Sequence, residues 1–138
     1  MNEFSPEDIR STSVRILVVD DQPKVRQGLR MMLALEPDLA IVGEAEDGTQ
    51  ALTLARSLHP DVVLMDVAMP NLDGIAATSA LRAVAPEARV IMLSVHDDPK
   101  TRRQAEQAGA VAFVAKHSGH RTLVATLRQV VASDVDSE

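Results

Sequence analysis

The sequence predicts an α/β protein in which helices alternate with the strands of a parallel sheet. Two observations predict this class. Short apolar runs alternate five times with segments whose apolar residues recur at helical spacing. The central run, residues 62–65, is apolar at every position, which is typical of a strand buried on both faces of a parallel sheet. Because crossovers between parallel strands are right-handed, we expect helices on both faces of the sheet.

The first two strand–helix units end before Pro60. Residues 15–19 (RILVV) form the first predicted strand, and Pro23 suits the first turn of the helix that follows. Residues 39–45 form a second, more polar strand, which favours a position at the edge of the sheet. The second helix is predicted over residues 51–58, where apolar residues again recur at helical spacing.

The third and fourth units contain the most apolar predicted strands. The third strand ends at Asp66, and a loop marked by Pro70 leads to a helix from about Leu72 to Ala83. Residues 89–93 (RVIML) form the fourth strand, which ends at Ser94. Both strands therefore end at a polar residue, and open parallel sheets bind their ligands at the carboxyl ends of the strands.

The last two helices differ in apolar content. The helix after Asp98–Pro99 has only Ala105 and Ala108 on its apolar face, whereas the fifth strand, residues 111–115, leads through Lys116 to a fully amphipathic helix. The apolar face of that last helix is made by Leu123, Val124, Leu127, Val130 and Val131. A narrow apolar stripe implies weak anchoring, and weakly held elements are the ones that move in conformational switching.

Length and charge indicate one folded domain with polar ends. We expect a flexible leader over residues 1–13, a folded domain over 14–132, and an acidic tail or the start of a linker over 133–138. The net charge is −6, of which −2 lies in the leader and −3 in the tail, so the folded domain is nearly neutral. With no basic face and one aromatic residue in the body, this chain alone is not expected to bind nucleic acid.

The composition also excludes other classes of protein. The 138 residues include no cysteine, so neither a disulfide framework nor a thiolate metal site can form. The longest apolar run, residues 110–115, is far shorter than the roughly 18 residues needed to span a bilayer. The N-terminus is polar and acidic, unlike a secretory signal. We therefore expect a cytoplasmic protein with no membrane partner.

Four of the five predicted strands end at residues whose side chains can bind ligands or take part in catalysis: Asp20–Asp21, Asp66, Ser94 and Lys116. Because the carboxyl ends of parallel strands meet at one edge of a sheet, these side chains are expected to share a shallow pocket. Three crowded carboxylates repel one another unless one is protonated or they share a cation. Oxygen ligands with open water positions suit Mg²⁺. An acid, a metal, a hydroxyl and an ammonium group together suit phosphoryl transfer.

These residues lie in motifs that resemble those of bacterial two-component response regulators. The chain resembles their receiver domain over about residues 14–132, in the motifs VVDD (18–21), LMDVAMPNLDG (64–74), VIMLS (90–94) and AGAVAFVAK (108–116). The stretch VIMLSVHDD is closest in character to receivers of helix-turn-helix transcriptional regulators. The resemblance implies a flavodoxin-like sheet of strand order 2-1-3-4-5.

The resemblance also implies a role for each site residue. Asp66 would accept a phosphoryl group from the phosphohistidine of a sensor histidine kinase or a phosphotransfer protein. Mg²⁺ would be bound by Asp21, Asp66 and the backbone carbonyl of Ala68, with Asp20 acting through water. Contacts to the phosphoryl oxygens would come from Ser94 and Lys116, and Ser94 with Phe113 would form the switch. Such a domain assists its own phosphorylation and dephosphorylation without being an enzyme, and phosphorylation can produce a homodimer.

The sequence departs from the family pattern at two positions. His117 follows Lys116, where many receivers have a proline, frequently with a cis bond, which is costly before any other residue. Ala68 stands where several receivers carry a polar side chain. Because metal binding at that position would use the main chain, we expect Ala68 to change the dephosphorylation rate rather than to abolish function.

Other interpretations stay open at this stage. Asp20–Asp21 could cap the following helix, and Phe113 could be ordinary core packing. A receiver-fold binding module could signal without phosphorylation. A phosphohydrolase of the haloacid dehalogenase type would also use an aspartyl phosphate and Mg²⁺, but it needs a second acid where this chain has Ala68. Dinucleotide binding is disfavoured, because no G-x-G-x-x-G follows any predicted strand.

Overall fold

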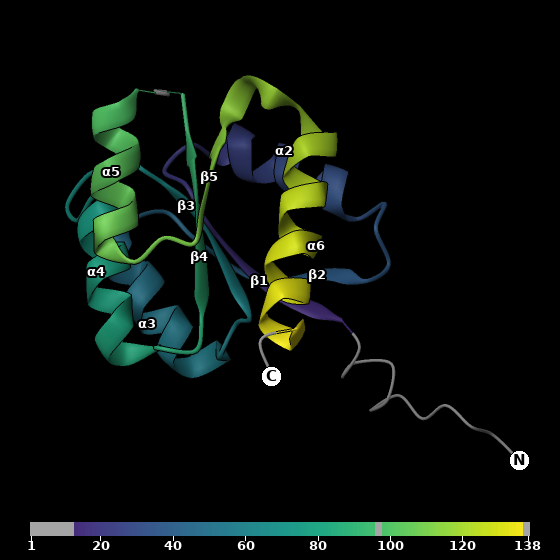
Figure 1. Ribbon diagram of the computed structural model, residues 1–138, viewed down its shortest axis with the longest axis horizontal. Coiled ribbons are helices and arrows are strands. Elements are labelled where there is room, and N and C mark those ends of the chain that lie inside the picture. The colour runs from purple at the N-terminus through teal and green to yellow at the C-terminus, as the bar shows by residue number, and fades with distance from the viewer. Residues whose placement is uncertain (1–12, 96–97, 137–138) are drawn as a thin grey trace, which may run out of the picture.

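The computed structural model of this protein describes residues 13–95 and 98–136, and within that part it forms one parallel sheet with helices on both faces (Figure 1). The strands are β1 (Val14–Val19), β2 (Leu39–Ala45), β3 (Val62–Asp66), β4 (Arg89–Ser94) and β5 (Ala112–Ala115). Their order is β2-β1-β3-β4-β5, and every neighbouring pair is parallel. The predicted fold class and strand order are confirmed, including the edge position of β2.

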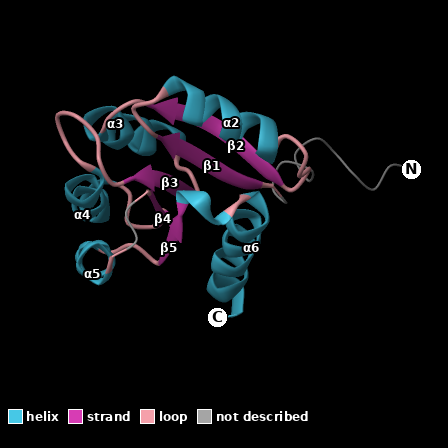
Figure 2. Ribbon diagram, turned by 90° about the horizontal axis from the view of Figure 1, so that it is seen from above, coloured by secondary structure: helices cyan, strands magenta, loops and turns pink. Residues whose placement is uncertain are grey.

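In chain order, an α-helix follows each strand except β5. The helices are α2 (Pro23–Leu33), α3 (Gly48–Leu58), α4 (Gly74–Val84), α5 (Pro99–Ala108) and α6 (His120–Asp136), and a short 3₁₀ helix, η1 (Lys116–Ser118), joins β5 to α6. Among these, α2 and α6 cover one face of the sheet, and α3, α4 and α5 cover the other (Figure 2).

Alternate residues of β1 supply the two cores. Ile16 and Val18 pack with Leu33 of α2 and with the buried face of α6. Leu17 and Val19 point the other way and pack with alanines of α3, α4 and α5. All four of these β1 side chains are buried. A strand buried on both faces has no polar alternation, which explains why the central runs of the sequence are apolar at every position.

Most predicted boundaries agree with the structure to within two residues. The helix expected from about Leu72 begins at Gly74, and β4 includes Ser94. The last helix continues to Asp136, so most of the segment expected as an acidic tail or linker extends α6. Residues 1–12 of the expected leader lie outside the described residues, and the division into leader, domain and tail stays a prediction.

Helix α5 has the narrow apolar stripe that the sequence predicts. Its buried residues are Ala105 and Ala108 alone. The Asp98 side chain caps its N-terminus by accepting a hydrogen bond from the Thr101 backbone, and Gly109 ends it with a φ of 117°. Helix α6 is held more firmly, because three of its large apolar side chains are buried.

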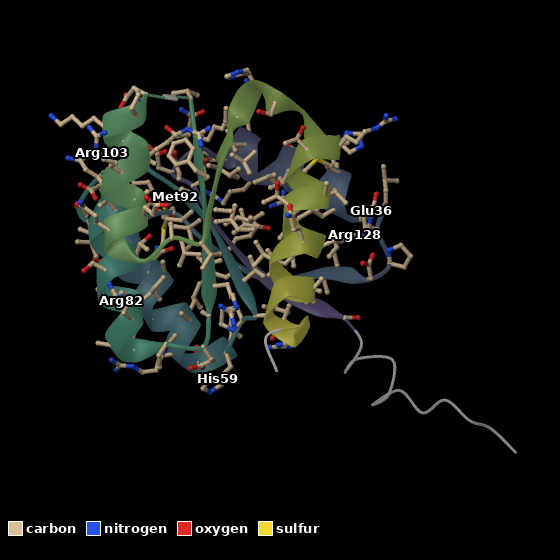
Figure 3. The ribbon with its side chains drawn as sticks, in the orientation of Figure 1. Glu36, His59, Arg82, Met92, Arg103 and Arg128 are labelled. Atoms are coloured by element: carbon tan, nitrogen blue, oxygen red, sulfur yellow. The ribbon has the colours of Figure 1, made fainter. Side chains whose placement is uncertain are left out.

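Ion pairs add a second link between α6 and the rest of the domain. The Arg128 guanidinium donates hydrogen bonds to Asp38 at 2.8 and 3.0 Å and to Glu36 at 2.7 Å, both in the loop between α2 and β2 (Figure 3). The hydrogen bond from Arg128 lowers the pKa of Asp38. These contacts join α6 to the loop that follows α2, the other helix on the same face of the sheet.

Gly74 allows the first turn of α4 to pack directly against the end of β3. A Cβ atom at Gly74 would overlap the carbonyl oxygen of Asp66 and come within 3.0 Å of the Val67 Cα. Backbone atoms cannot move aside as a flexible side chain can. The absence of a side chain at Gly74 therefore allows the short distance between α4 and Asp66, the residue that ends the central strand.

Gly74→Ala is expected to lower the free energy of unfolding by about 1–3 kcal/mol, because the added methyl group overlaps fixed backbone. Urea denaturation followed by circular dichroism measures the change. Gly28→Ala is the matched control: Gly28 lies inside α2, where a Cβ meets no atom within 4 Å, so this change is expected to stabilise the protein by about 0.5–1 kcal/mol. Equal stability of Gly74→Ala and wild type would contradict the close approach.

Candidate functional site

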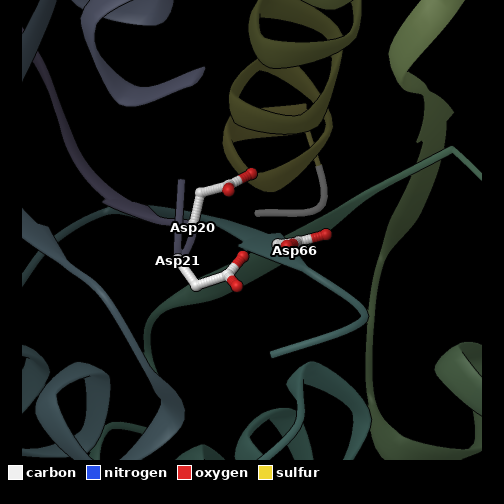
Figure 4. Close-up of side chains that lie close together, drawn as sticks. All are labelled: Asp20, Asp21 and Asp66. Carbon is white, nitrogen blue, oxygen red and sulfur yellow. The ribbon is translucent and has the colours of Figure 1, made fainter. Parts of the chain in front are cut away.

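Three carboxylates meet at the carboxyl edge of the sheet (Figure 4). Asp20 and Asp21 follow β1 directly, and Asp66 is the last residue of the neighbouring strand β3. One oxygen of each acid lies within 4.8 Å of the others. Asp20 and Asp66 are buried, whereas Asp21 is exposed. The topology thus brings together the acids that the sequence predicts at one edge.

Lys116 enters this cluster from the end of β5. Its ammonium nitrogen lies 2.8 Å from Asp20 Oδ2 and 3.2 Å from Asp66 Oδ1. Burial opposes the charge of Lys116, but the hydrogen bond to Asp20 and the charge of Asp66 outweigh it and raise the pKa of the ammonium group. Lys116 is therefore a fixed positive charge that bridges two of the three acids.

The surroundings of Asp66 disfavour its ionised form. Burial raises its pKa to about 6, the negative charge of Asp20 adds to the effect, and Lys116 opposes it. A buried carboxylate beside two other acids is only partly compensated by one ammonium group. The charge of Asp66 therefore depends on what else binds in the pocket.

The donor set fits a divalent cation that prefers oxygen. Three carboxylates offer oxygen atoms close enough to share one ion, and the exposed position of Asp21 leaves room for water ligands. Hard oxygen ligands with retained waters suit Mg²⁺. A shared cation would also relieve the mutual repulsion of the acids, which Lys116 alone only partly offsets.

The other predicted site residues lie around this cluster. Ser94 is the buried last residue of β4, and β4 pairs with β3 so that Asp66 faces Leu93. Ala68 is exposed in the loop that follows Asp66. Phe113 is half-buried in β5, with the Arg102 guanidinium of α5 4.7 Å from the centre of its ring. The roles expected of Ser94, Ala68 and Phe113 stay predictions.

The helix-capping interpretation of Asp20–Asp21 is wrong. The N-cap residue of α2 is Gln22, whose side chain makes no capping hydrogen bond. Asp20 Oδ1 accepts a hydrogen bond from the Gln22 backbone at 2.9 Å, within the loop and before the helix begins.

Every peptide bond in the described residues is trans, so His117 follows Lys116 without a cis bond, and η1 forms the turn there.

Sequence reasoning missed the contacts that fix the loop after Asp66. Asn71 has a φ of 68°, and its side chain donates a hydrogen bond to Asp47 Oδ2 at 3.2 Å. Asp47 also caps α3, so one carboxylate links the start of α3 to this loop. The Gly48 amide donates to the Leu72 carbonyl at 3.2 Å in the same place. Asp47 and Gly48 therefore both begin α3 and support the loop after Asp66.

Comparisons with known proteins identify the family. The response regulator receiver domain family matches residues 16–128. Response regulator GacA of Pseudomonas aeruginosa is 41% identical over 119 residues, which cover 86% of this chain and 56% of that protein. The probable transcriptional regulatory protein NarL of Mycobacterium tuberculosis is 40% identical over 111 residues, 80% of this chain and 51% of the relative. This chain therefore spans about half the length of the curated relatives it matches.

Solved structures agree with the sequence comparison. The receiver domain of the M. tuberculosis NarL superposes with a TM-score of 0.82 at 38% identity, covering 86% of this chain and 95% of that one. A CheX–CheY–BeF₃–Mg²⁺ complex from Borrelia burgdorferi gives a TM-score of 0.79 at 25% identity, covering 85% of this chain and 88% of the other.

In the described part of the chain, no helix has the length and apolar content of a membrane span.

Asp66→Asn is expected to stabilise the protein near pH 7.5 in the absence of divalent cations. Because the pKa of Asp66 is raised to about 6 in the folded state, its contribution to stability is complete below its unfolded pKa of about 4 and is lost as the pH rises through 6. Asparagine is neutral throughout. The gain is at most about 3 kcal/mol at pH 7.5 and close to zero at pH 4.

Urea denaturation at the two pH values measures this difference. Asp21→Asn removes the exposed acid of the same cluster and serves as the control, with a much smaller gain expected because no buried charge is removed. An Asp66→Asn protein that is no more stable than wild type at pH 7.5 would show that the burial of Asp66 carries no cost.

Proposed function

Because this chain belongs to the response regulator receiver domain family, we propose that Asp66 accepts a phosphoryl group from the phosphohistidine of a sensor histidine kinase or a phosphotransfer protein. The observation that carries the proposal is the cluster at the end of the central strand, where Lys116 lies 2.8 Å from Asp20 and 3.2 Å from Asp66. This cluster combines an acceptor carboxylate, a cation site and a fixed ammonium group. Those are the parts that transfer of a phosphoryl group requires.

The transfer is a displacement at phosphorus. A carboxylate oxygen of Asp66 forms the new P–O bond, and the P–N bond to the donor histidine breaks with its electron pair staying on the imidazole nitrogen. The product is a mixed anhydride of Asp66 and phosphoric acid. The reaction uses the ionised form of Asp66, so whatever lowers its raised pKa also activates it.

Mg²⁺ is the proposed cofactor, bound by Asp21, Asp66 and the main-chain carbonyl of Ala68, with Asp20 acting through water. When bound, the ion neutralises negative charge on the acceptor and on the phosphoryl oxygens. The three acids supply oxygen donors within 4.8 Å of one another, and the B. burgdorferi relative was solved with magnesium and BeF₃. Both facts support this assignment.

Lys116 and Ser94 are the proposed contacts to the phosphoryl oxygens. The Lys116 ammonium group sits between Asp20 and Asp66 before reaction, and it would exchange the Asp20 carboxylate for a phosphoryl oxygen. The Ser94 hydroxyl would donate to another oxygen from the end of β4. Lys116 would supply a positive charge and Ser94 a hydrogen-bond donor, both already near Asp66 before the reaction. The chain would thus stabilise the phosphoryl group on its own Asp66, and it would not act as an enzyme on a separate substrate.

Phosphorylation would then change the face formed by α5, β5 and α6. The new group adds nearly two negative charges at Asp66. Movement of Ser94 toward them would leave space into which Phe113 turns. Ala105 and Ala108 are the buried residues of helix α5, and so small a buried surface favours a shift between two populations over a new fold. We expect a second copy of this chain or another protein to bind that face after phosphorylation.

The wider setting is also part of the proposal. We place the exchange in the cytoplasm, with a histidine kinase as the donor, and we assign the chain no contact of its own with nucleic acid or membrane. The relatives that are twice as long include a probable transcriptional regulatory protein, which supports an output in transcription for a longer protein of this kind. A phosphohydrolase activity is disfavoured, because Ala68 stands where the second acid would be needed.

Incubation with acetyl phosphate and Mg²⁺ is expected to add one phosphoryl group, detected by intact-mass spectrometry. The adduct should be absent without Mg²⁺ and absent from Asp66→Asn, because both the cation and the acceptor oxygen are lost. Asp73→Asn is a matched control, since this exposed acid caps α4 outside the cluster, and it should be phosphorylated as the wild type is.

Two results would contradict the assignment. An adduct on Asp66→Asn would move the acceptor to another residue. A wild-type protein that stays folded and unmodified would favour a receiver-fold binding module that works without phosphorylation.

A further inference from the structure

The loop that carries Asp20 and Asp21 is short and lacks the usual cap at the start of its helix. Only residues 20–22 separate β1 from α2, and Gln22 provides no side-chain cap. Besides the hydrogen bond from Lys116 to Asp20, two backbone amides hold the loop: the Asp20 amide donates to the Ala45 carbonyl of β2 at 3.0 Å, and the Gln22 amide donates to Asp20 Oδ1 at 2.9 Å. Both involve Asp20, the buried member of the pair.

A further contact comes from α2 and reaches back to the loop. The Arg26 guanidinium donates a hydrogen bond from Nη1 to the Asp20 carbonyl oxygen at 2.6 Å. Its Nε lies 3.2 Å from Glu44 Oε1 on the edge strand β2, and the Arg26 side chain is 17% exposed. Planar guanidinium groups can bind two acceptors at once in a fixed orientation, which an ammonium group cannot do as well.

Glu44 in turn is held by a second arginine. Arg30, one helical turn after Arg26, places Nη1 2.6 Å from both carboxylate oxygens of Glu44. Arg26 and Arg30 therefore share the same carboxylate and the same helix. In the described residues, Arg26 is the one of the two that also donates a hydrogen bond to the Asp20 backbone. The Arg30 side chain is also more exposed, at 49% against 17%.

The carboxylate cluster creates the need for such a contact. Three acids within 4.8 Å repel one another, and the acids on the loop can relieve the repulsion by moving away from Asp66, which is fixed in a central strand. A charge-assisted hydrogen bond to the Asp20 carbonyl opposes that movement without occupying a carboxylate oxygen. Arg26 therefore takes no carboxylate oxygen away from a cation, whereas the Gln22 amide and Lys116 already donate to the two carboxylate oxygens of Asp20.

We propose that Arg26, oriented by Glu44, is a positioning residue that holds the Asp20–Asp21 loop where its carboxylates can share a divalent cation with Asp66. This inference rests on the proposed function. It assigns a task to a residue that touches neither the cation nor the phosphoryl group. Groups that orient metal ligands in this way commonly change metal affinity by about 10–100-fold when they are removed.

The sign of the effect separates positioning from simple electrostatics. Removal of a positive charge near a cation site strengthens binding of the cation, because a repulsion is lost. Loss of a positioning contact weakens binding. Arg26→Gln is therefore expected to lower Mg²⁺ affinity about 10-fold, whereas Arg30→Gln, which removes the same charge one turn away, should leave the affinity within about twofold or raise it slightly.

The experiment is a Mg²⁺ titration of the isotope-labelled chain, followed by the backbone amide signals of residues 19–22 and 66 in two-dimensional NMR. The full spectrum of each variant reports that the domain is folded. Arg26→Lys keeps the charge but cannot bind Glu44 and the Asp20 carbonyl with a planar fork, so it should fall between Arg26→Gln and wild type. Glu44→Gln should weaken Mg²⁺ binding less than Arg26→Gln, since the contact to Asp20 remains.

Each outcome decides between the alternatives. Wild type that shows no Mg²⁺-dependent shift at these amides would overturn the proposed cation site itself. If wild type binds Mg²⁺ and Arg26→Gln binds it equally or more tightly, the positioning role is wrong. Equal weakening by Arg26→Gln and Arg30→Gln would also refute it, because only one of these arginines contacts Asp20. Should Arg26→Gln not fold, the comparison of Arg26→Lys with Arg30→Gln applies the same criterion.

Discussion

Repulsion among three carboxylates is the constraint around which this domain is built. Asp20, Asp21 and Asp66 lie at the ends of two neighbouring strands, and Lys116, 96 residues from Asp20 in the sequence, supplies an ammonium group that bridges Asp20 and Asp66. Without the parallel sheet, nothing would bring these charges to one place. The same closeness that costs stability forms the acidic pocket on which the proposed phosphoryl transfer depends, so stability and the proposed function oppose each other at Asp66.

The fold and the ends of the strands could be predicted from sequence because both follow from local patterns. Continuous apolar runs identify buried strands, and a parallel sheet places all their carboxyl ends at one edge, so Asp66 and Lys116 had to lie near each other. The family motifs then suggested a role for each site residue. Strand patterns and family motifs together therefore predict which side chains form the site.

The contacts that position those groups could not be predicted, because they depend on side-chain geometry between distant elements. The sequence gives no sign that Gly74 contacts the end of β3, although its lack of a Cβ is what lets α4 approach Asp66. The link from Asn71 to Asp47 joins two separate loops. Arg26 carries no sequence signal at all, since an arginine on an amphipathic helix is ordinarily a solvated residue.

The narrow apolar stripe of α5 has an evolutionary consequence. Only two of its ten residues contribute to the core, and both are alanines. The remaining positions can therefore change identity with little effect on the core of the domain, while each change alters its exposed surface. Duplicated copies of such a chain can come to differ along α5 and still keep the same core and the same acidic cluster. A helix that contributes little to the core thus leaves one surface of the domain free to diverge while the fold stays the same.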